Sequence, residues 1–175
     1  MRFLFIQLLG LIPSIISFSS LQSGNRRRIL LLQFLCCILW VIHYILLGAA
    51  TGALINLLGL LRAAVCAYND RQWAKSPLWL VFFLICYAVS PLLTWDGPHC
   101  LLLGGAMILT TVALWVNDMR LTRLLYLCNS PLVLAYNLIA GSWSSALIEV
   151  FALTSFIIAL WRFDIRPALH TRARS

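Results

Sequence analysis

The sequence has few charged residues, and few of those are acidic. Only 10% of its 175 residues are Asp, Glu, Lys or Arg, and five are Asp or Glu, whereas 62% are hydrophobic and the mean hydropathy is +0.94. Soluble domains carry about 25% charged residues, so this chain has too little polar surface for a water-soluble globule. We expect one compact domain embedded in a lipid bilayer. Its spans must be helices, because backbone groups in lipid need partners within the chain.

Motifs of catalysis and cofactor binding are missing as well. The chain has no C-x-x-C pair, no glycine-rich phosphate loop, no zinc-ligand spacing and no set of nucleophile, base and acid. We therefore expect no enzyme activity, no metal and no cofactor. The six cysteines lie in or beside apolar runs, as small buried side chains do, and are Cys36, Cys37, Cys66, Cys86, Cys100 and Cys128.

The net charge of +8 does not indicate nucleic-acid binding. The basic residues stand in short clusters at the ends of apolar runs, where Lys and Arg face anionic lipid headgroups. A cleavable signal peptide is not expected either. The apolar run after Arg2 has a poor small-residue cleavage site and further apolar runs follow it, so we interpret it as a retained helix.

Seven apolar runs have the length of a transmembrane helix. Such a helix needs about 20 residues, with a range of roughly 17 to 25. Turn residues or charge clusters separate the runs. The expected spans cover residues 3–20, 29–48, 52–68, 78–95, 100–116, 121–140 and 143–161.

The Lys and Arg residues between these spans predict the orientation of the chain. Three follow the first span, two follow the third, two follow the fifth and four lie in the tail, all on one side of a seven-span protein. Arg2 falls on the other side, and Arg62 lies within a span. Because positively charged loops stay in the cytoplasm, we expect the N-terminus outside and the C-terminus in the cytoplasm.

A hairpin pattern occurs twice in the chain. Residues 43–68 and 136–161 both begin with an aromatic beside a polar group, continue with a small-residue turn, and end with an apolar run that carries one polar residue. At this offset of 93 residues Gly48 aligns with Gly141. We interpret the chain as two parallel three-helix repeats, 1–71 and 98–163, joined by a linker helix in 72–97 and followed by a basic tail, 164–175.

Short motifs resemble those of SWEET and PQ-loop membrane proteins. Leu39-Trp40 followed by Tyr44 is similar to their L-W-x-x-Y-G-L pattern, and Asn56-Leu-Leu-Gly59 is similar to their N-x-x-G pattern. The resemblance implies a 3+1+3 arrangement of helices that moves a small polar solute by alternating access. Glu149 stands where those proteins have a second sugar-contacting asparagine, which disfavours a neutral sugar as the solute.

A closer resemblance is to the YgjV family of bacterial inner membrane proteins. The segment Val41 to Gly48 is similar to that family's pattern in the first repeat. In the second repeat, Ala140 to Ser142, Ile148-Glu149 and residues 161–163 are similar to it. The resemblance extends over nearly the whole chain. It implies a multi-pass protein of the bacterial inner membrane, with a periplasmic N-terminus.

Five polar side chains are expected at one depth in the membrane. His43, Asn56, Tyr136, Asn137 and Glu149 each lie three to six residues from the outer end of their span. This places them roughly 5 to 10 Å below that end, at about 1.5 Å per residue. Polar groups are expensive within lipid, so we expect these residues to line a shared cavity for substrate binding or proton coupling. The alternative, above all for Asn56, is hydrogen bonding between helices.

Glu149 has the strongest case for function, because it is the only acidic residue inside an expected span. It could bind a cation or an amine, or carry a proton, and its shared depth with His43 would allow the two to pair. A histidine on an apolar helix more often has a structural role. Trp40 either walls the same cavity or anchors its helix at the interface. Arg62 either extends to a carbonyl or the interface, or binds an anionic solute.

The expected function is therefore that of a transporter or facilitator of a small polar solute that remains unidentified. Two alternatives stay open, since a ligand-binding receptor and a structural subunit of a membrane complex can have the same fold. Self-association into a homo-oligomer is compatible with all three.

Reporter fusions test the expected topology. A cytoplasmic reporter placed after Ser175 and another placed in the loop before Arg26 should both be active, because seven spans put both sites on the side of the positively charged loops. A periplasmic reporter at Gly97 should be active, and the same reporter at Ser175 should not. If the reporters place Ser175 and the arginine cluster on opposite sides of the membrane, this result contradicts both the span count and the repeat.

Overall fold

The computed structural model describes the backbone of residues 2–21, 26–68, 71–116 and 118–165. Within these residues the chain is all-α, as predicted, with no strand. A π-helix, Trp161–Ile165, continues the last α-helix, and most of the expected basic tail lies outside the described residues. The seven described α-helices are α1 (Arg2–Leu21), α2 (Arg26–Leu47), α3 (Ala50–Ala67), α4 (Leu78–Leu93), α5 (His99–Trp115), α6 (Met119–Ile139) and α7 (Trp143–Leu160).

The helices differ in how clearly their length and hydropathy indicate a membrane span. Two of the described segments are long and apolar enough to cross a bilayer by themselves, Ala50–Ala67 and Trp143–Phe163. Four further apolar segments are shorter, and helices of that length span a bilayer only where it thins or where neighbours compensate. The shorter segments are Phe3–Ile16, Phe34–Leu47, Leu78–Leu93 and His99–Trp115. Seven spans therefore stay a prediction.

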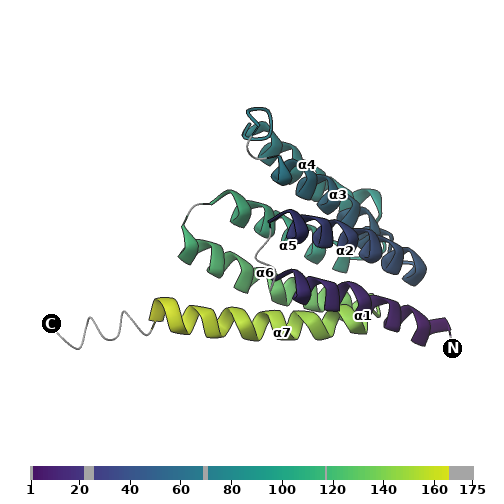
Figure 1. Ribbon diagram of the computed structural model, residues 1–175. Helices are drawn as coiled ribbons and strands as arrows, with labels where there is room; N and C mark the ends of the chain where they lie inside the picture. Colours follow the sequence, from purple (N-terminus) through teal and green to yellow (C-terminus); the bar gives the residue numbers. More distant parts are fainter. Residues whose placement is uncertain (1, 22–25, 69–70, 117, 166–175) are drawn as a thin grey trace.

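Six of the helices form a closed ring, and the seventh packs outside it. Helix α1 packs against α2 and α7, α3 packs against α2 and α5, and α6 packs against α5 and α7. Helix α4 packs against α3 and α5 only, apart from minor contacts. Figure 1 shows α4 on one side of the molecule and α1 with α7 on the other. It also shows that α1 begins at one end of the bundle and α7 ends at the opposite end.

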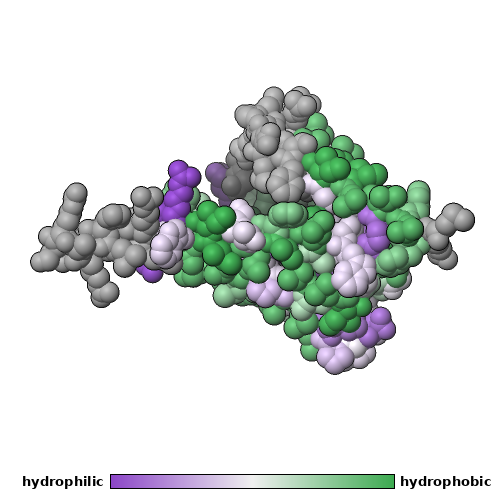
Figure 2. All heavy atoms as spheres, turned by 90° about the horizontal axis from the view of Figure 1, so that it is seen from below, coloured by the Kyte–Doolittle hydropathy of each residue, from purple (hydrophilic) through white to green (hydrophobic). Residues whose placement is uncertain are grey.

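The surface of this bundle is apolar and its interior is partly polar. Figure 2 shows a face on which hydrophobic residues cover most of the described surface. Large apolar side chains such as Leu4, Leu93 and Phe151 are more than half exposed. In contrast, Thr111 and Asn137 are almost fully buried. This distribution suits a lipid environment, where hydrocarbon solvates the outer face and polar groups must find partners inside.

The turns between α2 and α3 and between α6 and α7 have the same conformation. Gly48 and Gly141 have φ angles of 79° and 73°, in the left-handed region that favours glycine. The next residues, Ala49 and Ser142, have φ and ψ of −86° and 79° and of −89° and 75°. Each glycine N–H donates to the carbonyl three residues earlier. We call the end of the bundle that contains both turns the turn end.

Helices α4 and α5 approach each other closely at Gly104. A Cβ atom added there would lie 2.9 Å from the backbone oxygen of Tyr87 and would press on the Pro91 ring. At the next residue, Gly105, an added Cβ would meet no atom within 4 Å. The two adjacent glycines therefore differ in whether a methyl group fits.

We expect Gly104→Ala to lower the free energy of unfolding by about 1 to 3 kcal/mol, because the backbone of α4 must move. The matched control Gly105→Ala should be neutral or stabilising by up to about 1 kcal/mol, since alanine favours a helix. Thermal unfolding of the purified variants in detergent measures both. Equal stability of the two variants would contradict this packing of α4 on α5.

Candidate functional site

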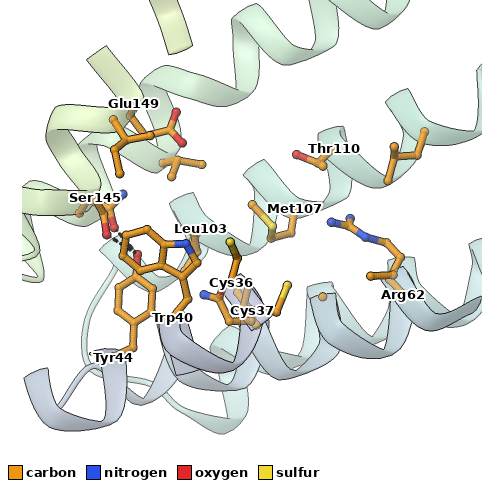
Figure 3. Close-up of a pocket in the computed structure, with 18 of the residues that line it drawn as sticks. Cys36, Cys37, Trp40, Tyr44, Arg62, Leu103, Met107, Thr110, Ser145 and Glu149 are labelled. Atoms are coloured by element: carbon orange, nitrogen blue, oxygen red, sulfur yellow. Dashed lines mark hydrogen bonds between the residues drawn. The ribbon is translucent and has the colours of Figure 1, made fainter. Parts of the chain in front are cut away.

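A partly open cavity of about 520 Å³ lies inside the ring of helices. Side chains from α2, α3, α5, α6 and α7 line it, and Figure 3 shows several of them pointing into one space. Lining residues recur every three or four positions, as expected for one face of each helix. Among them are Cys36, Trp40 and Tyr44 on α2, Asn56, Gly59 and Ala63 on α3, Leu103, Met107 and Thr110 on α5, Val133 and Asn137 on α6, and Ser145 and Glu149 on α7.

The cavity extends along most of the bundle and is closed near the turn end. Its lining includes Cys66 and Leu114, each one residue from the far end of its helix. At the turn end the Tyr44 hydroxyl donates to Asn137 Oδ1 over 2.6 Å and lies 3.4 Å from Ser145 Oγ. This contact joins α2, α6 and α7. A hydrogen bond between helices in a membrane contributes about 0.6 kcal/mol on average and up to about 1.7 kcal/mol.

His43 lies beside this closure but outside the cavity. Its side chain is fully buried, and Nδ1 donates to the carbonyl oxygen of Ile6 on α1 over 3.1 Å. Nε2 lies 2.8 Å from Ser142 Oγ, which in turn lies 2.7 Å from Ser145 Oγ. Both ring nitrogens thus have partners within the protein. His43 therefore does not form the pair with Glu149 that their shared depth would allow, and it joins α1 and α2 to the start of α7.

Glu149 projects into the cavity without a satisfied carboxyl group. Its Oε2 atom is buried and has no hydrogen-bond partner among the described residues. Ser130 Oγ is close to the carboxyl group, but it too is buried without a partner that meets hydrogen-bond geometry. Unpaired buried polar atoms are uncommon in native proteins, since each costs about 1 to 3 kcal/mol. The position therefore suits a polar ligand, water or an exchanging proton.

A family comparison identifies the group to which the chain belongs. A family model described as a bacterial inner membrane protein, Imp-YgjV, matches residues 4–166. The chain belongs to the YgjV family. This YgjV-family protein is accordingly a bacterial inner membrane protein, as its resemblance implied. No curated protein and no solved structure has significant similarity to it.

The structure brings four of the six predicted site residues of this YgjV-family protein together. Trp40, Asn56, Asn137 and Glu149 all line the central cavity. Asn56 also donates from Nδ2 to the carbonyl oxygen of Gly52 over 2.8 Å. The remaining two residues, His43 and Tyr136, do not line this cavity.

Tyr136 lines a second, smaller cavity instead. This cavity has a volume of about 180 Å³ and lies at the turn end, with Thr51, Asp96 and His99 in its walls. Its residues on α2, α3, α5 and α6 lie within about one helical turn of those that line the central cavity. The two cavities therefore follow one another along the same four helices, with the side chains of Tyr44, Tyr136 and Asn137 between them.

Several lining residues were not predicted from the sequence. Ser145 closes the turn end, Thr110 contributes a hydroxyl, and Cys36 and Cys37 contribute thiols. For Ser145, Cys36 and Cys37 the usable signal is spacing, because they fall three or four positions from Glu149 or Trp40, whereas Thr110 has no such neighbour. Small polar and sulfur-containing side chains are common in apolar helices, so residue type alone did not distinguish them.

The placement of His43 predicts a structural role that a stability measurement can test. His43→Ala removes two contacts and leaves a void among buried groups, so we expect it to lower the free energy of unfolding by about 2 to 3 kcal/mol. The control His99→Ala changes a partly exposed histidine at the turn end and should have a smaller effect. A fully stable His43→Ala protein that fails to move solute would instead assign His43 to the solute path.

Proposed function

We propose that this protein is a SWEET-like transporter or facilitator that moves a small polar solute across the inner membrane by alternating access. The observation that carries the proposal is a cavity with several polar groups in its lining, into which Glu149 projects with an unpaired oxygen atom. The cavity volume of about 520 Å³ lies in the range of small-molecule sites. Trp40, Asn56 and Asn137 add the mixture of aromatic and amide groups that such sites use to orient a ligand.

The two consecutive cavities support alternating access. The central cavity reaches the end of the bundle opposite the turns, and the smaller cavity lies at the turn end. Between them stands the Tyr44–Asn137 hydrogen bond. Separation of α2 from α6 at this bond would join the cavities into one path, while closure at the far end would complete the cycle. In the proposed topology the present conformation faces the cytoplasm.

Equivalent contacts at the 93-residue offset support two parallel three-helix repeats. On one side of the ring, Gln7 on α1 accepts from the Ser144 N–H over 3.1 Å. On the other side, Cys100 on α5 accepts from the Thr51 hydroxyl over 3.1 Å. Cys100 lies 93 residues after Gln7, and Ser144 lies 93 residues after Thr51, so the two contacts are counterparts. Together with the matched glycine turns, they favour α4 as a linker between repeats that rock against each other.

Glu149 gives the proposed transporter a means of coupling to protons. A carboxyl group that faces a water-accessible cavity in a membrane protein can take up a proton on one side and release it on the other. Asn56, its counterpart in the first repeat, cannot exchange a proton. The two halves of the cavity are therefore chemically unequal at this depth.

Uptake into liposomes tests the function. Purified protein reconstituted in liposomes should take up at least one member of a panel of sugars, amino acids and organic acids, with a dependence on the pH gradient. Glu149→Gln keeps the size of the side chain and removes the exchangeable proton, so it should abolish the pH dependence and lower uptake about tenfold or more. The control Ser155→Ala changes an exposed position on the same helix and should have no effect.

Each alternative function has a different result in the same experiment. Saturable binding without uptake would indicate a receptor. A stable protein partner, with neither binding nor uptake, would indicate a structural subunit of a membrane complex. Uptake that is unchanged by Glu149→Gln would exclude Glu149 as the coupling residue.

A further inference from the structure

Arg62 is a cation within a membrane-spanning helix, and the described residues supply it with only neutral partners. Its Nη1 donates to Thr111 Oγ1 on α5 over 2.7 Å. Its guanidinium carbon lies 5.3 Å from the ring centroid of Tyr87 on α4. No described Asp or Glu forms an ion pair with it. Charged residues in membrane helices normally pair with one another or mark a solute path, because an unpaired charge is costly there.

The other ionisable groups close to Arg62 do not compensate its charge. They are the thiols of Cys37 and Cys66 and the phenol of Tyr126, which are neutral at ordinary pH. Glu149, the only acidic residue of the described helices α1 to α7, lies elsewhere in the cavity. The guanidinium has five N–H donors in a planar fork, and only one of them has a described acceptor.

A second unpaired donor lies at the same end of the cavity as the guanidinium. Thr110 precedes Thr111, whose hydroxyl oxygen accepts the hydrogen bond from Arg62. The side chain of Thr110 lines the same cavity. Its Oγ1 atom is buried without a hydrogen-bond partner among the described residues. Figure 3 shows Thr110 and Arg62 at the same end of the cavity, away from Glu149. This end therefore offers a positive fork and a free hydroxyl, with no acceptor to match them.

We infer that Arg62 and Thr110 form an anion subsite, and that the solute of the proposed transporter is a small organic carboxylate. The inference rests on the proposed function and names its substrate class. Two parallel N–H donors of a guanidinium match the two oxygens of a carboxylate, and the Thr110 hydroxyl can donate to the same group. One guanidinium neutralises one carboxylate, whereas a phosphate dianion would leave a net negative charge in the bundle.

The geometry keeps this subsite separate from Glu149. Asn56 and Glu149 each lie six residues after the first residue of their helices, and Arg62 lies six residues further along α3 than Asn56. At about 1.5 Å per residue, the two levels differ by roughly 9 Å along the bundle. A bound carboxylate at Arg62 therefore does not meet the Glu149 carboxyl group. Glu149 stays free to exchange a proton while the anion is bound. The anion and the proton can therefore be transported together.

The experiment compares carboxylates with uncharged analogues of the same shape. Lactate and propionate, their amides lactamide and propionamide, and inorganic phosphate serve as probes. Binding to purified protein is measured by thermal stabilisation, and uptake is measured in liposomes. We expect the carboxylates to bind and to be taken up, and the amides and phosphate to bind at least about tenfold more weakly, because only carboxylates match the charge and the fork.

Four variants of the same chain identify the residues responsible. Arg62→Gln should weaken carboxylate binding at least about tenfold, Arg62→Lys should retain part of it, and Thr110→Val should weaken it about fivefold. The control Thr154→Val removes an exposed hydroxyl that donates to the Val150 carbonyl, and it should have no effect. If Arg62→Gln fails to fold, Thr110→Val decides, since the Thr110 hydroxyl has no protein partner to lose.

The outcomes separate this inference from the proposed function. Uptake of amides or other neutral solutes that needs Glu149 but is unchanged by Arg62→Gln would overturn the carboxylate assignment and leave transport standing. Preferential binding of phosphate, or carboxylate binding unaffected by both Arg62→Gln and Thr110→Val, would overturn the assignment as well. Absence of binding and uptake for every probe, and for the wider panel of sugars and amino acids, would overturn both proposals.

Discussion

The hydrogen bond from Tyr44 to Asn137 is the interaction on which the interior of the bundle depends. It is short, it is fully buried, and it joins α2 to α6 across the centre of the ring. In an apolar bundle the hydrophobic effect does not draw helices together, so close packing and hydrogen bonds of this kind set their positions. The bond closes the central cavity at the turn end, and it leaves Glu149 and Arg62 on the open side. Its modest strength suits the breaking and re-forming that the proposed alternating access requires.

Much of the fold could be predicted from the sequence, because lipid limits the possible structures. Long apolar runs can satisfy their backbone only as helices, and turn residues or charge clusters end each run. The predicted spans accordingly match the seven observed helices to within a few residues at most ends. The two glycine turns were predicted as equivalent from the repeated hairpin pattern, in which Gly48 aligns with Gly141, and their backbone angles agree. The order of helices around the ring was not predicted, since apolar surfaces of similar composition do not specify neighbours.

The candidate site was predicted less completely, because the sequence does not determine in which direction each side chain points. Depth in the membrane follows from residue number, so Asn56, Asn137 and Glu149 were expected at one level and all line the cavity. The direction of a side chain around the helix axis depends on neighbours that the sequence does not name. His43 has the expected depth but points toward Ile6 and Ser142, and Tyr136 points toward the second cavity. The charge of Arg62 within a span was evident in the sequence. Its neutral surroundings, which indicate a function, are evident only in the structure.

The contact between α1 and α7 has a consequence for biogenesis. Helices enter the membrane in the order of synthesis, so α1 and α2 are present long before the residues that satisfy them. Gln7 bonds to the Gly141 carbonyl and to the Ser144 N–H, and His43 contacts Ser142, all at the start of α7. Until the last helix packs, Gln7 lacks both of these partners and Nε2 of His43 lacks one, so the ring has an open seam. The ring of helices therefore closes only when the final segment of the chain is in place.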